Sequence, residues 1–177
     1  MPANVLASRI GVFVKLAESV RGTLGRTSLM KLCFFLQTLR DVPLHYDFSL
    51  YSYGPFDSEL LSDLQTAENI CVLETNIQHY PGGYRYHIKP GEESDRAKEI
   101  ASEVLAKYHG DIHWVAETFG NKSASDLELL STIVFINEQG VRNREQLCKE
   151  VKSVKPHFAE WQITRQIDWL ISERLLN

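Results

Sequence analysis

Apolar residues recur at helical spacing over most of the chain, and this pattern predicts a protein built mainly from helices. Residues 5–20 place their apolar side chains on one helical face. Residues 29–40 are apolar on nearly all sides, which indicates a helix in the centre of the core. The glycines of "RGTLGR" separate these two segments, and Thr27 or Ser28 is expected to cap the second helix.

A short strand is predicted next, in the segment "YDFSLYSY" at residues 46–53, where polar and apolar side chains alternate. Gly54 and Pro55 follow it, and we expect them to end the strand because proline cannot donate a backbone hydrogen bond. Tyr51 and Tyr53 would then lie on one face of the strand, since strand side chains alternate with a period of two.

A third helix and a β-hairpin complete the first half of the chain. Asp57 or Ser58 can cap the helix, and two β-rich runs in residues 71–90 flank the turn sequence "PGG". Two helices followed by a helix and a hairpin are the outline of a winged helix, to which the strand at 46–53 is an addition. We therefore expect residues 1–91 to form a winged-helix-like unit.

The second half of the chain, residues 92–177, predicts a helical bundle packed against the first unit. Helical stripes lie on both sides of Gly110, Ser125 has the spacing of a capping box, and Asn143 can cap a short helix. A last helix is expected over residues 158–176. Three helices joined by short turns resemble a helix-turn-helix bundle, so the expected fold class is α+β and predominantly helical.

The charge balance limits how nucleic acid could bind. The chain has 177 residues, 44% of them apolar, which suffices for one domain or two small ones. It carries 19 basic and 23 acidic residues, so it lacks the basic excess of a protein that neutralises many phosphates. Any nucleic-acid site must therefore be local.

The cysteines and the N-terminal sequence indicate a cytoplasmic protein. The three cysteines are odd in number and far apart, which argues against a disulfide framework or a zinc ribbon and favours reduced thiols. The first residues lack a basic stretch followed by a continuous apolar run, so we expect no signal peptide, and no apolar run reaches the length of a membrane span.

Enzyme motifs are missing from the sequence. It contains no P-loop, no GxGxxG and no GxSxG elbow. Cys33 lies in the apolar helix, where burial raises the pKa of a thiol and makes it inert. His109 and His113 have the spacing of a helical metal pair, with Asp111 as the one further candidate, but Gly110 lies between them at an expected helix break. We expect no cofactor and no metal, and a metal-dependent enzyme is the least favoured hypothesis.

The stretch "YSYGPFD" is the candidate site for a protein partner. The helix after it, residues 57–69, would read DNA in a winged helix, yet it has no basic residue and phosphate would repel its acids. Two interpretations of the aromatics stay open: they are core side chains at a corner, or they are an exposed platform for a partner. The candidate residues are Tyr51, Tyr53, Gly54, Pro55, Phe56 and Asp57. The acids of the helix are Asp57, Glu59, Asp63 and Glu68.

The segment 141–157 is the most basic in the chain, with five basic residues against two acidic ones. A solvated helix of mixed charge is the favoured interpretation. A patch that binds phosphate is the alternative, and with it a DNA-binding transcriptional regulator. The basic residues are Arg142, Arg144, Lys149, Lys152 and Lys155.

Parts of the chain resemble a known family. The segment "LMKLCFFLQ" and the turn "DFSLYSYGPF" look like the lysine-plus-aromatic helix and the Tyr-Gly-Pro turn of YwgA-like proteins, which belong with the Panacea (SocA-like antitoxin) domains. The later "VKSVKPHF" is also similar. The matching residues are Lys31, Leu32, Phe34, Phe35, Phe48, Tyr53, Gly54, Pro55 and Leu60.

This resemblance implies a mostly helical, winged-helix-related fold without catalysis. Panacea domains are associated with neutralising toxins by direct binding, and related proteins have been called transcriptional regulators. The residues and the resemblance together predict a non-enzymatic protein-binding module, either an antitoxin or a regulatory or defence-associated accessory protein.

Overall fold

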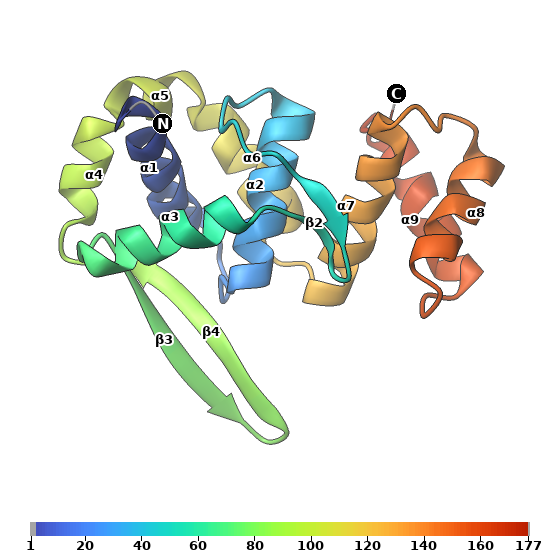
Figure 1. Ribbon diagram of the computed structural model, residues 1–177, viewed down its shortest axis with the longest axis horizontal. Helices are drawn as coiled ribbons and strands as arrows, with labels where there is room; N and C mark the ends of the chain where they lie inside the picture. The colour runs from blue at the N-terminus through green and yellow to red at the C-terminus, as the bar shows by residue number, and fades with distance from the viewer. Residues whose placement is uncertain (1–2, 177) are drawn as a thin grey trace. The chain divides into compact units, whose positions relative to one another are not determined.

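The computed structural model describes residues 3–176 and has a mixed α+β fold that is mostly helical, with two small antiparallel sheets (Figure 1). This confirms the predicted fold class at that level. None of the helices in the described range has both the length and the apolar character that a membrane span needs.

The chain divides into two compact units, which differ from the expected division after residue 91. Unit 1 holds the residues up to Asp47 together with Asp57–Lys122, and unit 2 holds Phe48–Phe56 together with the residues from Ser123 onward. The segment that carries the two candidate tyrosines therefore leaves the first unit and joins the second. Sequence periodicity cannot show such an exchange, because it reports on each element separately.

Unit 1 consists of six helices and a hairpin within the described residues. The hairpin pairs two strands antiparallel, with Tyr80 opposite Gly83, as the "PGG" turn predicts. Helix α2 begins earlier than expected, after Gly25, so Thr27 and Ser28 are helical residues and do not cap it. The elements are α1 (Ala3–Ser19), α2 (Arg26–Arg40), α3 (Ser58–Asn69), β3 (Leu73–Tyr80), β4 (Gly83–Pro90), α4 (Ser94–Ile100), α5 (Ser102–Lys107) and α6 (His109–Phe119).

Helix α2 lies in the core of unit 1, as its nearly continuous apolar sequence predicts. It is buried without interruption from Leu29 to Leu36, and the ring of Phe35 stacks on Phe119 with the centroids 4.1 Å apart. The residues of the lysine-plus-aromatic helix, Lys31 and Phe34 among them, are all buried. Their place in this structure is therefore the interior of unit 1 rather than its surface.

A buried arginine joins α1 to α3 and to the chain segment before unit 2. Arg9 donates from Nε to the carbonyl of Leu44 at 2.5 Å, from Nη2 to the carbonyl of His45 at 2.7 Å and from Nη1 to Asp63 at 3.0 Å. Its guanidinium lies 3.9 Å from the ring centroid of Tyr46, whose hydroxyl donates to Asp63. Burial raises the pKa of the Asp63 carboxyl, while the hydrogen bonds from Tyr46 and Arg9 oppose that rise.

Unit 2 combines a small hairpin with three helices. Its elements are β1 (Ser49–Tyr51), β2 (Gly54–Phe56), α7 (Ala124–Glu138), α8 (Arg144–Val154) and α9 (Glu160–Ser172). Asn143 caps α8 by accepting from two backbone amides, as expected. The cap of α7 is Ser123 and not Ser125, since the Ser123 hydroxyl accepts from the Asp126 amide at 3.0 Å.

The predicted strand over 46–53 is wrong in one important respect. Gly54 and Pro55 do not end a strand but form β2, which pairs antiparallel with β1 so that Tyr51 lies opposite Gly54. Ser52 and Tyr53 form the turn between the strands, so Tyr51 and Tyr53 do not share one strand face. Pro55 is tolerated because both strands of a two-stranded sheet are edge strands, where a missing donor costs little.

The Arg9 contacts give the first testable prediction. Replacing Arg9→Met leaves the buried Asp63 carboxylate without its cation, which should lower the free energy of unfolding by about 3–5 kcal/mol. The double variant Arg9→Met with Asp63→Leu should recover only part of that loss, because it removes the unpaired buried carboxylate but leaves the carbonyls of Leu44 and His45 without their donor. Urea unfolding followed by circular dichroism measures both values.

Arg21→Met is the matched control for this experiment. Arg21 also pairs with a carboxylate, that of Glu117 at 3.2 Å, but both side chains are exposed. Its removal should change the free energy of unfolding by less than about 1 kcal/mol. Equal effects of Arg9→Met and Arg21→Met would contradict the structural role given to Arg9.

Candidate functional site

The hairpin of unit 2 ends in two exposed aromatic side chains. Tyr51 is 62% exposed and Tyr53 is 72% exposed, and we call residues 51–53 the aromatic tip. The ring of Tyr51 also contacts the half-buried Phe56, with the centroids 5.3 Å apart. Of the two interpretations that the sequence leaves open, core residues or exposed platform, these exposures agree with the second for both tyrosines.

Gly54 brings the hairpin close to α7. Its φ is +88°, a backbone conformation that glycine adopts without steric cost. A Cβ at this position would lie 3.0 Å from the Ser131 hydroxyl and 3.3 Å from the Glu128 carbonyl oxygen. Gly54 and Pro55 are buried and do not belong to the exposed surface predicted for them. Both residues lie where β2 packs against α7.

A buried ion pair fixes the backbone of the aromatic tip. Lys155 is only 2% exposed, and its Nζ lies 2.8 Å from Oε1 of the buried Glu128. The same ammonium donates to the carbonyl oxygens of Tyr51 and Ser52. Nε2 of His157 lies 3.4 Å from the same Oε1 of Glu128. The two carbonyls at the turn are thus held by a cation that water does not reach.

The buried position of Lys155 corrects the prediction that all five basic residues of the segment 141–157 lie at the surface. The favoured interpretation made Lys155 a solvated side chain and the alternative made it a phosphate ligand, but its ammonium is buried and pairs with Glu128 inside unit 2. The side chain turns inward because a carboxylate and two turn carbonyls meet at that point, and a lysine stem can cross apolar surroundings to reach them.

Three of the other four basic residues of the segment are also engaged within unit 2. Arg144 forms a two-point pair with Asp168, at 2.7 and 2.8 Å. Lys152 donates to two carbonyls after α8, at 2.9 and 2.7 Å, and Arg142 donates to Asn137 at 2.8 Å. Lys149, the fifth basic residue, is exposed and has no ion pair or hydrogen bond with any residue in the range 3–176. The segment does not form a free cationic patch.

The acids of α3 are used inside unit 1. Asp57 caps the helix and also accepts from the Asp47 amide at 2.7 Å. Glu59 pairs with the buried Arg9 at 3.1 Å, and Asp63 is buried beside it. Glu68 accepts from the Thr75 hydroxyl. All four acids are therefore engaged in contacts inside unit 1.

The histidines considered as metal ligands have other neighbours. The rings of His109 and His113 stack with centroids 6.5 Å apart, and Asp111 pairs with Arg40 at 2.7 Å. In the part of the chain that the structure describes, no group of three or more His, Cys, Asp or Glu side chains is placed to hold a metal ion. Cys33 is buried, and burial raises the pKa of its thiol far above the ordinary value.

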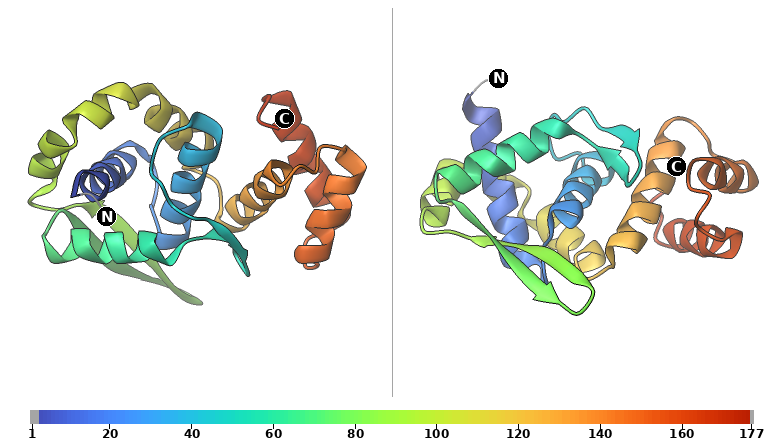
Figure 2. Two further views of the ribbon diagram at one scale, coloured as in Figure 1. Left: turned by 45° about the horizontal axis from the view of Figure 1, so that its top comes forward. Right: turned by 60° about the horizontal axis from the view of Figure 1, so that its bottom comes forward.

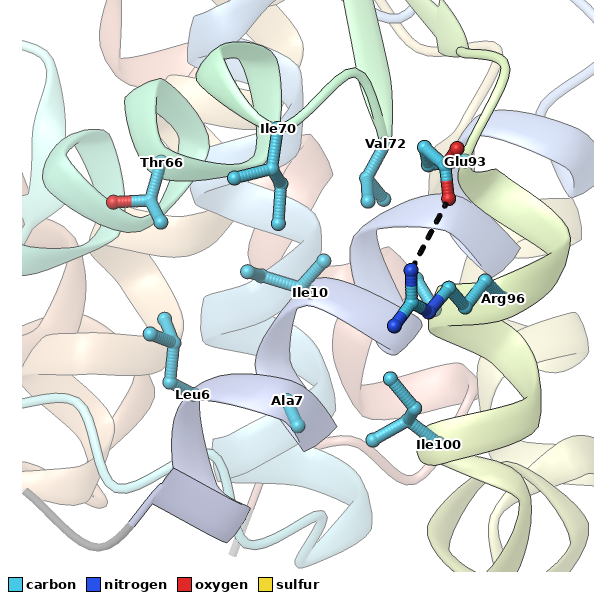
Figure 3. Close-up of a pocket in the computed structure, with 10 residues that line it drawn as sticks. Leu6, Ala7, Ile10, Thr66, Ile70, Val72, Glu93, Arg96 and Ile100 are labelled. Carbon is cyan, nitrogen blue, oxygen red and sulfur yellow. Dashed lines mark ion pairs between the residues drawn. The ribbon is translucent and has the colours of Figure 1, made fainter.

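Unit 1 also has an open apolar groove that the sequence does not reveal. Its volume is about 410 Å³. Figure 3 shows side chains from α1, α3 and α4 directed toward one space, with the Glu93–Arg96 ion pair at its edge. Sequence reasoning missed it because its walls come from three elements. The lining residues are Leu6, Ala7, Ile10, Thr66, Ile70, Val72, Glu93, Arg96, Ala97 and Ile100.

No protein-family model matches this chain, and no curated protein sequence matches it. Two surfaces of the protein carry exposed aromatic or aliphatic side chains: the aromatic tip of unit 2 and the apolar groove of unit 1.

The seating of the hairpin gives a second prediction. Gly54→Ala should lower the free energy of unfolding by about 2–4 kcal/mol, since it adds left-handed strain and a clash with α7. Gly140→Ala is the control, because Gly140 has a similar φ of +98° but nothing within 4 Å of an added Cβ. It should cost about 1–2 kcal/mol from backbone strain alone. Equal losses in thermal unfolding would show that the contact with α7 carries no energy.

Proposed function

We propose that this chain is a non-enzymatic protein-binding module and that the aromatic tip contacts its partner. One observation carries the proposal: Tyr51 and Tyr53 are both more than half exposed on a turn whose carbonyls a buried lysine holds. Tyrosine is enriched among residues that dominate binding energy at interfaces. A turn that is already fixed loses little entropy on binding.

The same proposal includes the finer features expected from the sequence. Helices α1, α2 and α3 with the hairpin β3–β4 would correspond to a winged helix, and α7, α8 and α9 to a helix-turn-helix-like bundle. The resemblance to YwgA-like and Panacea domains supports an antitoxin or a regulatory or defence-associated accessory protein in the cytoplasm. The partner would then be another protein, such as a toxin.

The two segments that could bind DNA, the basic residues of 142–155 and helix α3, offer little free positive charge. Four of the five basic side chains in 142–155 are engaged in contacts within unit 2. Helix α3 offers phosphates no base. Both observations remove the local positive surface that the DNA-binding regulator requires.

Partner binding should depend on the two tyrosines. We expect Tyr51→Ala and Tyr53→Ala each to weaken it by on the order of 1–2 kcal/mol, while the melting temperature falls only slightly because both rings are exposed. Tyr84→Ala is the matched control, since Tyr84 is another exposed hairpin tyrosine, 57% accessible, in unit 1. Affinity purification of the tagged full chain from its source cells, followed by mass spectrometry, compares the three variants.

A protein that the wild type and Tyr84→Ala retain, but that the tip variants lose, is the expected outcome. Retention of the same proteins by all variants would contradict the role of the tip. If the tip variants instead unfold several degrees lower than Tyr84→Ala, the tyrosines contribute to the core and the proposed surface is wrong.

A DNA experiment tests the alternative directly. We expect no salt-sensitive retention of the protein on double-stranded DNA. If retention occurs and Lys149→Ala lowers the slope of log affinity against log salt by about one, a phosphate contact exists. That result would support the regulator in place of the protein-binding module. Lys149 suits this test because its removal breaks no contact inside unit 2.

A further inference from the structure

The apolar groove of unit 1 has two walls that remain uncovered. Ile70, at the end of α3, is 51% exposed, and Ile100, at the end of α4, is 64% exposed. Helix α1 contributes Leu6 and Ile10 between them (Figure 3). Helix α1 contacts both α3 and α4, and Figure 2 shows α3 crossing it. Three helices thus form an open cradle in which Ile70 and Ile100 stay more than half exposed.

The shape of the groove suits the apolar face of a helix. Helical partners commonly lay apolar anchors, spaced three and four residues apart, into a groove between helices. The volume of about 410 Å³ lies within the range of roughly 300–1,000 Å³ found for binding pockets. Its open side and its exposed isoleucine walls fit a long apolar stripe better than an enclosed small molecule.

The charges near the groove indicate which charged residues the partner helix would carry beside its apolar stripe. Glu93 and Arg96 are groove residues that pair with one another at 4.0 Å, so they cancel. Two further acids are next to groove residues in the sequence: Glu92 precedes Glu93, and Glu99 precedes Ile100. Both side chains are exposed. Within residues 3–176 neither takes part in an ion pair. Residues 92–99 hold four acids and two bases, and Asp95 pairs with Lys98 at 2.9 Å, so this segment has a net negative charge that is complementary to lysine or arginine.

We propose that this groove binds an amphipathic helix of a protein partner, with an apolar stripe seated on α1 and a basic flank facing Glu92 and Glu99. The groove is a second binding surface, formed by residues other than the aromatic tip. It goes beyond the function proposed above and does not depend on the tyrosines.

A designed peptide tests the inference. The probe is a labelled peptide of about 18 residues, long enough to be helical when bound, with leucines at positions three and four apart and lysines on both flanks. A second peptide carries glutamates in place of the lysines, and a third has the first composition in scrambled order. Fluorescence anisotropy with the full chain should show at least about tenfold tighter binding of the lysine peptide than of the other two.

Two kinds of variant locate the site. Ala7→Trp fills the groove and should weaken the lysine peptide about tenfold or more, and Ile70→Gln with Ile100→Gln should do the same by removing the apolar walls. Glu92→Gln with Glu99→Gln should weaken it about three- to tenfold at low salt and less at high salt. Circular dichroism checks that each variant keeps its helical content.

The charge control is Asp41→Asn with Glu117→Gln, which removes two acids from α6 and the end of α2, elements that do not line the groove. It should leave the affinity unchanged. Tyr51→Ala should also leave it unchanged, so a failure of this proposal is separable from a failure of the aromatic tip.

Three results would overturn the proposal. The first is that no peptide binds, and the second is that the lysine and glutamate peptides bind equally well. The third is that Ala7→Trp and the double variant Ile70→Gln with Ile100→Gln both bind the lysine peptide as tightly as the wild type. Binding of the dye anilinonaphthalene sulfonate with no binding of any peptide would show that the groove takes only small apolar molecules, which also contradicts it.

Discussion

The aromatic tip depends on one desolvated ammonium group. Lys155 has left water, and a buried cation is stable only when nearby oxygens replace its hydration. Glu128 supplies the charge, and the carbonyls of Tyr51 and Ser52 supply the remaining acceptors. Because the turn cannot move without leaving the cation short of partners, the two tyrosine side chains are presented on a fixed backbone. Their exposure is thus a consequence of a buried interaction beneath them.

Unit 1 uses the same device at a different place. Arg9 satisfies the carbonyls of Leu44 and His45 and pairs with Asp63, so an irregular stretch of backbone is again held by a buried cation and an acid. These internal pairs consume charges that the sequence presents as surface features. The exposed side chains include the tyrosines of the tip and the isoleucines of the groove, and aromatic and aliphatic side chains of this kind are typical of protein interfaces.

Short-range patterns predicted much of the secondary structure correctly. The apolar character of 29–40 gave a buried helix, "PGG" gave a hairpin, and the Asn143 cap is present because its side chain acts on amides only two and three residues away. Errors occur where a distant contact decides. Gly54 and Pro55 looked like a strand end, yet packing against Ser131 on α7 makes them a second strand. The local sequence around Gly54 and Pro55 does not show that this segment packs against α7, more than seventy residues later in the chain.

The sequence by itself determined the fold class, the core helix, the hairpin after α3 and the aromatic composition of the tip, since these follow from local periodicity and turn chemistry. Only the tertiary structure decided that Lys155 is internal, that Asp63 is buried, and that residues 48–56 join unit 2. It alone assembled the groove, whose walls come from three helices. The physical reason is that burial and charge pairing depend on which distant residues meet, and a one-dimensional pattern does not contain that information.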